Sequence, residues 1–171
     1  MTASRSRSIL AVAALAALTA ACATAPTGPG ALPPPSGAFQ AQDFDWSARA
    51  GQSSINARVE YRQDGQAYRC TGSAGLTPDT PYTRARFQTL YGSTDRAAVP
   101  AAVVRARTVA DAGADYRSYV RSAPCENNRF SFSGLPDGGW FIIVPVSAGG
   151  DPVALMRRVE TRGGRAVDVT L

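Results

Sequence analysis

From about residue 52 onward, apolar and polar residues alternate in short runs that turn residues separate. In the stretch 54–61, every second residue from Ile55 to Tyr61 is apolar, which predicts a strand with one buried face. Further strands are expected at 67–76, 82–90, 128–132, 140–146, 153–161 and 166–171, with hairpin turns at 63–66 and 162–165. About seven short strands of this kind predict an all-β fold, a single antiparallel β-sandwich.

Residues 95–115 do not follow this rhythm. They are rich in alanine and contain clustered valines. Pro100 could begin a short helix, because proline suits the first helical position, and 103–109 could equally form a strand. We expect a helical or irregular excursion from the sandwich here.

The first 22 residues have the organisation of an export signal. Arg5 and Arg7 form a basic start, and an uncharged, mostly apolar run continues to Ala21. This run of about 13 residues is too short to cross a bilayer, which takes roughly 20 residues. We therefore expect export, with residues 1–21 acting as a signal peptide.

The apolar run ends in LTAAC at 18–22, which resembles the lipobox of bacterial lipoproteins. The resemblance implies that Cys22 receives lipid and anchors the chain to a membrane of the cell envelope. Ala23, which follows, implies the outer membrane, either on its periplasmic face or at the surface. The alternative is cleavage at the A-x-A pattern 21–23, which would remove the cysteine and release a soluble periplasmic or secreted domain.

Residues 23–38 contain five prolines, three glycines and no charged residue. Such a composition cannot bury enough apolar area to fold, so we predict a disordered tether over 22–51 and a sandwich domain over 52–171. A spacer is the favoured role of the tether, and a proline-rich ligand for a partner's aromatic groove is the alternative.

Three large apolar residues stand at the end of this tether, Phe39, Phe44 and Trp46. We expect them to pack onto the domain as an edge strand or clasp, because exposed aromatic clusters reduce solubility. The alternative is an aromatic contact surface for a partner or a sugar.

The composition excludes several kinds of chemistry. The sequence has no histidine, and all 18 of its basic residues are arginine. A Ser-His-Asp triad, a histidine-ligated zinc site and lysine Schiff-base chemistry are therefore absent. We expect no metal and no cofactor. No nucleic-acid partner is expected either, because the arginines are scattered among acidic and apolar residues.

Catalysis would have to rely on carboxylates, as in a glycoside-type hydrolase. The carboxylates considered for this role are Asp79, Asp111, Asp115, Glu126 and Asp137. No spacing singles out a pair, and Asp137 has a simpler role as an acceptor of backbone hydrogen bonds in its turn. The sequence therefore names no catalytic residue, and a hydrolase is the less favoured alternative.

The segment 130–142, FSFSGLPDGGWFI, resembles the carboxypeptidase regulatory-like domain, a transthyretin-like β-sandwich. In that family an F-x-F strand leads into an L-P-x-G turn, and an aromatic residue opens the next strand. The segment 72–82 adds a second likeness, to an L-x-P-x-T-x-Y pattern. The resemblance implies a non-catalytic accessory or adhesion module over 52–171.

The sequence contains three cysteines. If Cys22 carries lipid, Cys70 and Cys125 remain as a pair in an oxidising compartment, and we predict a disulfide between them. A bond that closes a loop of about 55 residues stabilises a protein by roughly 4 kcal/mol in the chain-entropy model. The alternative is two free, buried thiols.

One stretch is denser in reactive side chains than the rest, with Asp79, Tyr82, Arg84 and Arg86 close together. Arginines there could hold a carboxylate or phosphate in a bidentate manner, and Trp46 could add an aromatic contact. The alternative is a solvated loop. The favoured function is an envelope lipoprotein whose sandwich binds another envelope protein, and the alternative is a carbohydrate- or peptidoglycan-binding module.

Overall fold

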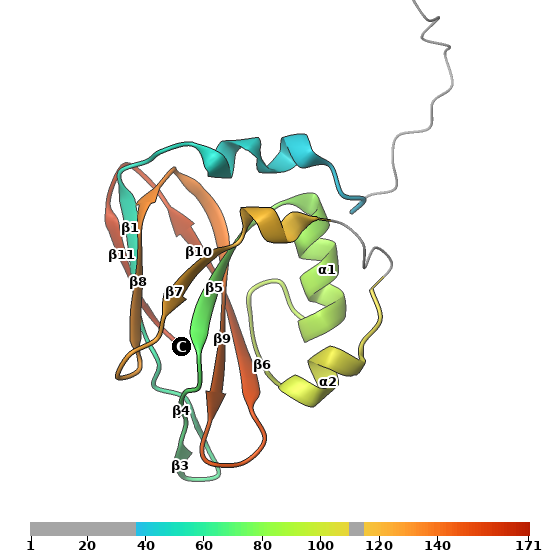
Figure 1. Ribbon diagram of the computed structural model, residues 1–171, viewed down its shortest axis with the longest axis vertical. Helices are drawn as coiled ribbons and strands as arrows, with labels where there is room; N and C mark the ends of the chain where they lie inside the picture. Colours follow the sequence, from blue (N-terminus) through green and yellow to red (C-terminus); the bar gives the residue numbers. More distant parts are fainter. Residues whose placement is uncertain (1–36, 110–114) are drawn as a thin grey trace, which may run out of the picture. The chain divides into compact units, whose positions relative to one another are not determined.

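The computed structural model describes residues 37–109 and 115–171. The predicted signal peptide, Cys22, most of the tether and Asp111 lie outside these residues. In the described part, two sheets pack face to face, which confirms the predicted all-β sandwich (Figure 1).

Strands dominate the chain, and helical segments stand before the first strand and between β5 and β7. The helical segments are η1 (Ala41–Ala48), α1 (Pro81–Tyr91), α2 (Ala101–Ala106) and η2 (Tyr116–Tyr119). The strands are β1 (Ser53–Arg58), β2 (Arg62–Gln63), β3 (Gln66–Ala67), β4 (Arg69–Cys70), β5 (Ser73–Pro78), β6 (Arg96–Pro100), β7 (Arg121–Pro124), β8 (Arg129–Leu135), β9 (Gly138–Ser147), β10 (Val153–Thr161) and β11 (Ala166–Thr170).

The small sheet has the strand order β11-β1-β8, and the large sheet has the order β6-β10-β9-β5-β7, with β4 also paired to β9. Strand β1 runs antiparallel to β8 but parallel to β11. The expected hairpin at 162–165 is therefore wrong, because β11 leaves β10 and joins the other sheet. Gly163 and Gly164 both have positive φ, and Asp137 accepts the Gly163 N–H at 2.6 Å.

Two other expected strands take different forms. The stretch 67–76 is divided among β3, β4 and β5, and β3 pairs only with β2 across the turn at 64–65. The stretch 82–90 is helix α1. Its ends explain the difference: Thr80 forms a capping box with Thr83, and Gly92 closes the helix in the left-handed conformation.

The excursion at 95–115 is partly helical, as expected. It begins with the edge strand β6, which the sequence did not suggest, and continues into α2. Pro100 is the N-cap residue of α2, one position before the first helical residue. Residues 110–114 of this stretch lie outside the described part.

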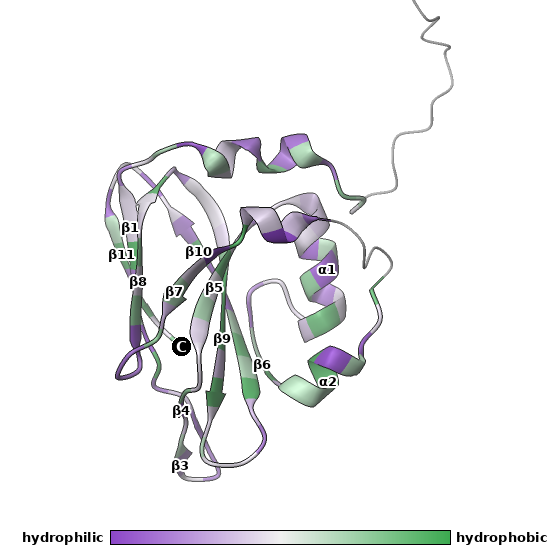
Figure 2. Cartoon of the chain, viewed as in Figure 1, coloured by the Kyte–Doolittle hydropathy of each residue, from purple (hydrophilic) through white to green (hydrophobic). Residues whose placement is uncertain are grey.

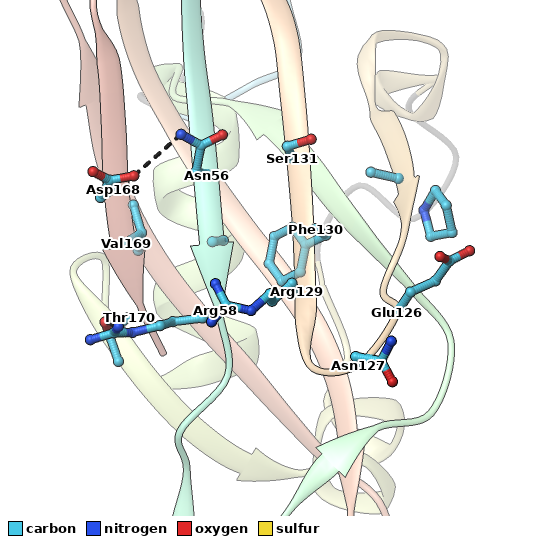
Figure 3. A pocket seen from close by; sticks show the side chains of 13 residues that line it. Asn56, Arg58, Glu126, Asn127, Arg129, Phe130, Ser131, Asp168, Val169 and Thr170 are labelled. Atoms are coloured by element: carbon cyan, nitrogen blue, oxygen red, sulfur yellow. Dashed lines mark hydrogen bonds between the residues drawn. The ribbon is translucent and has the colours of Figure 1, made fainter.

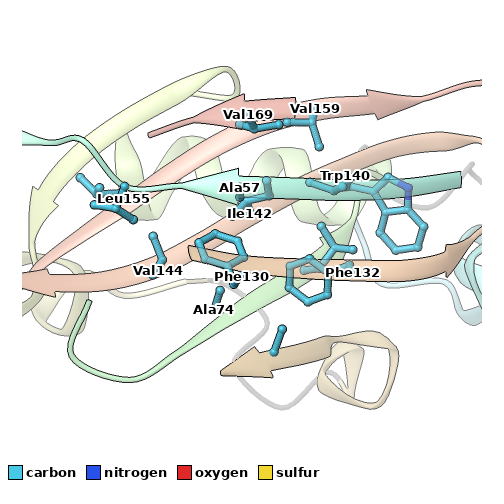
Figure 4. Packing of buried hydrophobic residues seen from close by; sticks show 14 of the residues in the cluster. Ala57, Ala74, Phe130, Phe132, Trp140, Ile142, Val144, Leu155, Val159 and Val169 are labelled. Atoms are coloured by element: carbon cyan, nitrogen blue, oxygen red, sulfur yellow. The ribbon is translucent and has the colours of Figure 1, made fainter. Parts of the chain in front are cut away.

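The large sheet is apolar on both faces. Along β9, Trp140, Ile142 and Val144 face the small sheet, and each is fully buried (Figure 4). Phe141 points the other way, where Phe87 of α1 covers it with the ring centroids 4.8 Å apart. Green colouring therefore runs along β9 in Figure 2. The chain consequently forms a third, helical layer on the outer face of this sheet.

The small sheet is apolar on its inner face alone. Ile55 and Ala57 of β1 and Phe130 and Phe132 of β8 are buried against the large sheet, as the alternating pattern predicts (Figure 4). The residues between them along the strands are mostly exposed. No helix of the described segments is long and apolar enough to span a bilayer.

Segment η1 closes one end of the sandwich. Phe44 is fully buried, and the indole of Trp46 meets that of Trp140 edge-on with the centroids 4.9 Å apart. The expected packing of Phe39, Phe44 and Trp46 is observed, with Phe44 and Trp46 in a 3-10 helix rather than an edge strand. Folded structure thus begins before residue 52, so the end of the predicted disordered tether is placed too late.

The predicted disulfide between Cys70 and Cys125 is confirmed, with the Cα atoms 6.0 Å apart. It joins β4 to the connection between β7 and β8. Asn128 of that connection also accepts a hydrogen bond from the Cys70 N–H at 3.0 Å. These two links tie the β7–β8 connection to the large sheet.

If η1 is part of the cooperative domain, Phe44→Ala should lower the free energy of unfolding by about 3–5 kcal/mol, because it leaves a cavity in place of an aromatic ring. Urea denaturation measures the change. Gln42→Ala, an exposed position of the same helix, should change it by less than about 0.5 kcal/mol. Equal stability of the two variants would show that η1 contributes nothing to folding.

Candidate functional site

The outer face of the small sheet carries a regular grid of polar side chains. Two rows of three residues cross β11, β1 and β8, and each row consists of register partners on the three strands. The first row is Asp168, Asn56 and Ser131, and the second row is Thr170, Arg58 and Arg129. Because strands rise about 3.3 Å per residue, the rows lie about 7 Å apart. All six side chains are exposed or half-exposed.

A groove of about 900 Å³ opens over this polar grid (Figure 3). Glu126 and Asn127, from the connection between β7 and β8, border it beyond the grid. Phe130 also lines it, although its side chain is buried on the inner face of the sheet and is only 6% exposed. The groove therefore offers a ligand mainly polar side chains.

The connection between β7 and β8 is a tight turn that asparagine makes possible. Asn127 and Asn128 have φ of 50° and 61°, a left-handed conformation that asparagine tolerates better than most residues. Glu126 and Arg129 exchange two backbone hydrogen bonds of 2.9 Å across the turn. Together with the links to Cys70, these bonds hold this border of the groove in place.

Within each row, a side-chain hydrogen bond joins β1 to β11. The Asn56 amide donates to the Asp168 carboxylate at 3.2 Å, and Arg58 Nε donates to the Thr170 hydroxyl at 3.0 Å (Figure 3). Two arginines and two carboxylates line the groove, so its formal charge is zero. Neither charge dominates the groove as a whole.

This arrangement suits a ligand that is rich in hydroxyl groups. Guanidinium and amide groups donate hydrogen bonds, carboxylates accept them, and serine and threonine do both. A hydroxyl group needs one partner of each kind. The groove supplies both kinds within the reach of a small polar ring, but it has no exposed aromatic side chain on which such a ring could stack.

The site residues expected from the sequence lie elsewhere, around the start of α1. The side chain of Asp79 is only 1% exposed. Arg84 donates two hydrogen bonds to it, at 2.5 and 2.7 Å, and Arg158 of β10 donates a third at 2.6 Å. The pKa of Arg84 is raised by its hydrogen bond to Asp79. This charge cluster binds α1 to the large sheet.

Tyr82 and Arg86 are also engaged within the fold. Tyr82 is 3% exposed and packs against Phe44 in an aromatic cluster. Arg86 donates to the Tyr82 hydroxyl at 3.3 Å, and its guanidinium lies 4.7 Å from the ring centre of Tyr116. Trp46 lies in η1, against Trp140. The structure therefore gives these residues packing contacts, and the segment is a helix rather than a solvated loop.

Among the described residues, the other carboxylates considered for catalysis each have surroundings of their own. Asp137 accepts hydrogen bonds from the Gly163 N–H at 2.6 Å and from the Ser53 hydroxyl at 2.9 Å, which hold its pKa below the usual range. Glu126 borders the groove, and Asp115 precedes η2. Within residues 37–109 and 115–171, no three metal-ligating side chains are grouped to hold an ion.

Sequence reasoning missed the polar grid because its members come from distant parts of the chain. Asn56 and Asp168 are 112 positions apart. The available signal was the polar half of each alternating strand, whose outward direction follows once the apolar half is assigned to the core. The order of the strands, which places the three polar halves together, could not be deduced.

The sequence matches no known family and no curated protein. The solved structures similar to this chain include a Pseudomonas aeruginosa protein described as a "putative carbohydrate binding protein". The match has a TM-score of 0.50 and 21% sequence identity, and it covers 78% of this chain and 97% of the other. At this identity the likeness supports the sandwich fold.

Asp79→Asn should lower the free energy of unfolding by about 2 kcal/mol, because it removes charged hydrogen bonds from a buried position. Thermal or urea denaturation measures this. Asp45→Asn, on the exposed side of η1, should have little effect. If Asp79 were a ligand-binding residue instead, the substitution would leave stability unchanged.

Proposed function

We propose that this chain is an exported, lipid-anchored and non-catalytic binding module of the bacterial cell envelope, and that its polar groove binds carbohydrate. The observation that carries the proposal is the polar grid of the small sheet. The outer face of the large sheet is covered by α1, whereas the groove is open and lined by paired donors and acceptors.

Two observations favour carbohydrate over a protein partner. A protein interface usually has an apolar or aromatic centre, and the exposed side chains of this groove are polar apart from Pro124. Sugars present hydroxyl groups at close spacing, which a neutral mixture of amides, carboxylates and guanidinium groups can bind. The similar Pseudomonas aeruginosa structure, described as a "putative carbohydrate binding protein", adds support from the shared fold.

Export and anchoring rest on the sequence. The basic start, the short apolar run and the LTAAC segment favour a lipoprotein signal with lipid on Cys22. The disulfide is compatible with this, since such bonds persist in oxidising compartments outside the cytoplasm. We place the protein in the cell envelope, at the outer membrane.

The non-catalytic role rests on the resemblance to the carboxypeptidase regulatory-like domain. The F-x-F pattern falls in β8 and the L-P-x-G turn leads into β9, where Trp140 begins the buried run. In this arrangement the motif residues serve the core of the sandwich. Of the motif segment, Phe130 and Ser131 line the groove, and the other residues of the groove come from outside it.

Asp168→Ala and Asn56→Ala should each weaken glycan binding by at least tenfold, because each removes a polar group from the first row. A glycan array with neutral, acidic and peptidoglycan-derived oligosaccharides finds the ligand, and calorimetry measures its affinity. Asp45→Ala makes the same change of charge outside the groove and should bind like the unaltered protein. Binding that survives both groove substitutions would place the site elsewhere.

Failure of every glycan on the array would contradict the carbohydrate proposal. Crosslinking in cells then tests the other candidate, an envelope protein that docks on the sandwich. If Asp168→Ala abolishes crosslinking to such a partner, the groove is still the binding site, but its ligand is a protein rather than a glycan.

The lipid anchor predicts the intact mass of the protein extracted from its native membrane. The expected mass corresponds to residues 22–171 plus acyl groups, and it should rise by two hydrogens when the disulfide is reduced. Cys22→Ala should abolish the acyl mass and release the protein from the membrane. A chain that starts after Ala23 without lipid would contradict anchoring.

A further inference from the structure

Two arginines face each other in the second row of the polar grid. Arg58 of β1 and Arg129 of β8 are register partners on antiparallel strands, which brings their Cα atoms within about 4.5–5.5 Å. Both side chains lie on the outer face and line the groove (Figure 3). Like charges at such positions repel each other and slightly destabilise a sheet.

Most of the donors of this pair are available to a ligand. The contacts of Arg58 to Thr170 and Glu60, at 3.0 and 3.1 Å, both use Nε. Its two terminal nitrogens therefore remain. Among the described residues, the Arg129 guanidinium takes part in no hydrogen bond or salt bridge. Each of the two exposed guanidinium groups presents paired N–H donors in one plane, a geometry that matches the two oxygens of a carboxylate.

The acidic residues near the groove do not neutralise this pair completely. Asp168 belongs to the first row and accepts from Asn56. Glu126 is the backbone partner of Arg129 across the β7–β8 turn, but its carboxylate points away from the arginine pair in Figure 3, and among the described residues it forms no salt bridge with Arg129. Glu60 contacts Arg58 and is 57% exposed, so water screens its charge. The groove is neutral overall but divided, with positive charge concentrated in the second row.

We propose that the groove binds a saccharide that carries a carboxylate, with Arg58 and Arg129 on the carboxylate and the first row on the hydroxyl groups. This inference rests on the carbohydrate-binding role proposed above. The rows are about 7 Å apart, a distance that the substituents of a six-membered sugar ring can bridge. An anion between the arginines also relieves their mutual repulsion.

Calorimetry with an oligogalacturonate and with its methyl ester tests the proposal, because the two probes share one backbone and differ in charge. The acid should bind at least tenfold more tightly than the ester, and its affinity should fall as salt rises. Arg58→Gln and Arg129→Gln should each reduce the affinity for the acid by at least tenfold and the affinity for the ester by a clearly smaller factor, so that the preference for the acid is lost. Arg105→Gln, an exposed position of α2, is the control for a general loss of charge.

The possible outcomes distinguish a failure of the carboxylate specificity from a failure of carbohydrate binding by the groove. If the acid and the ester bind with equal affinity, and Asn56→Ala abolishes binding of both, the groove binds carbohydrate but has no preference for an acidic one. Binding of the acid that Arg105→Gln weakens as much as Arg129→Gln would also overturn it. A sulfated oligosaccharide that binds more tightly than the oligogalacturonate would overturn the carboxylate assignment. If neither probe binds while the array identifies another neutral glycan, the acidic specificity alone fails.

Discussion

Strand β9 is apolar on both faces, and this constraint organises the rest of the molecule. Trp140 and Ile142 point inward, and Phe141 between them points outward, all without exposed surface. An antiparallel sheet can leave one face in water only when that face is polar. The large sheet must therefore be covered twice, by the small sheet on one side and by α1 on the other. The charge cluster around Asp79 then holds α1 where Phe87 can cover Phe141.

The same constraint decides where a ligand can bind. Because both faces of the large sheet are occupied, the open sheet face is the outer face of the small one. It carries two polar rows beneath a groove, with the arginine pair at one end and the Asn56–Asp168 hydrogen bond at the other. A polar, open site of this kind favours specific hydrogen bonding of a hydrophilic ligand over burial of apolar surface.

The proposed anchor and the groove have separate structural origins. The anchor depends on the first 22 residues, and the fold depends on residues from η1 onward. Segment η1 connects the two roles, because Phe44 and Trp46 fix the start of the folded domain.

The sequence by itself determined the sandwich, the inner face of β1, the bounds of β10 and the Cys70–Cys125 pair, because strand alternation and cysteine count are local or compositional signals. Only the tertiary structure decided that β11 pairs with β1 and that the polar rows meet. The helix at 82–90 was missed for a local reason, because the caps at Thr80 and Gly92 outweigh the strand-like pattern. The rows join residues as far apart as Asn56 and Asp168, and such distances depend on which strands become neighbours. Strand order is set by the burial of whole sheets, which no short stretch of sequence encodes.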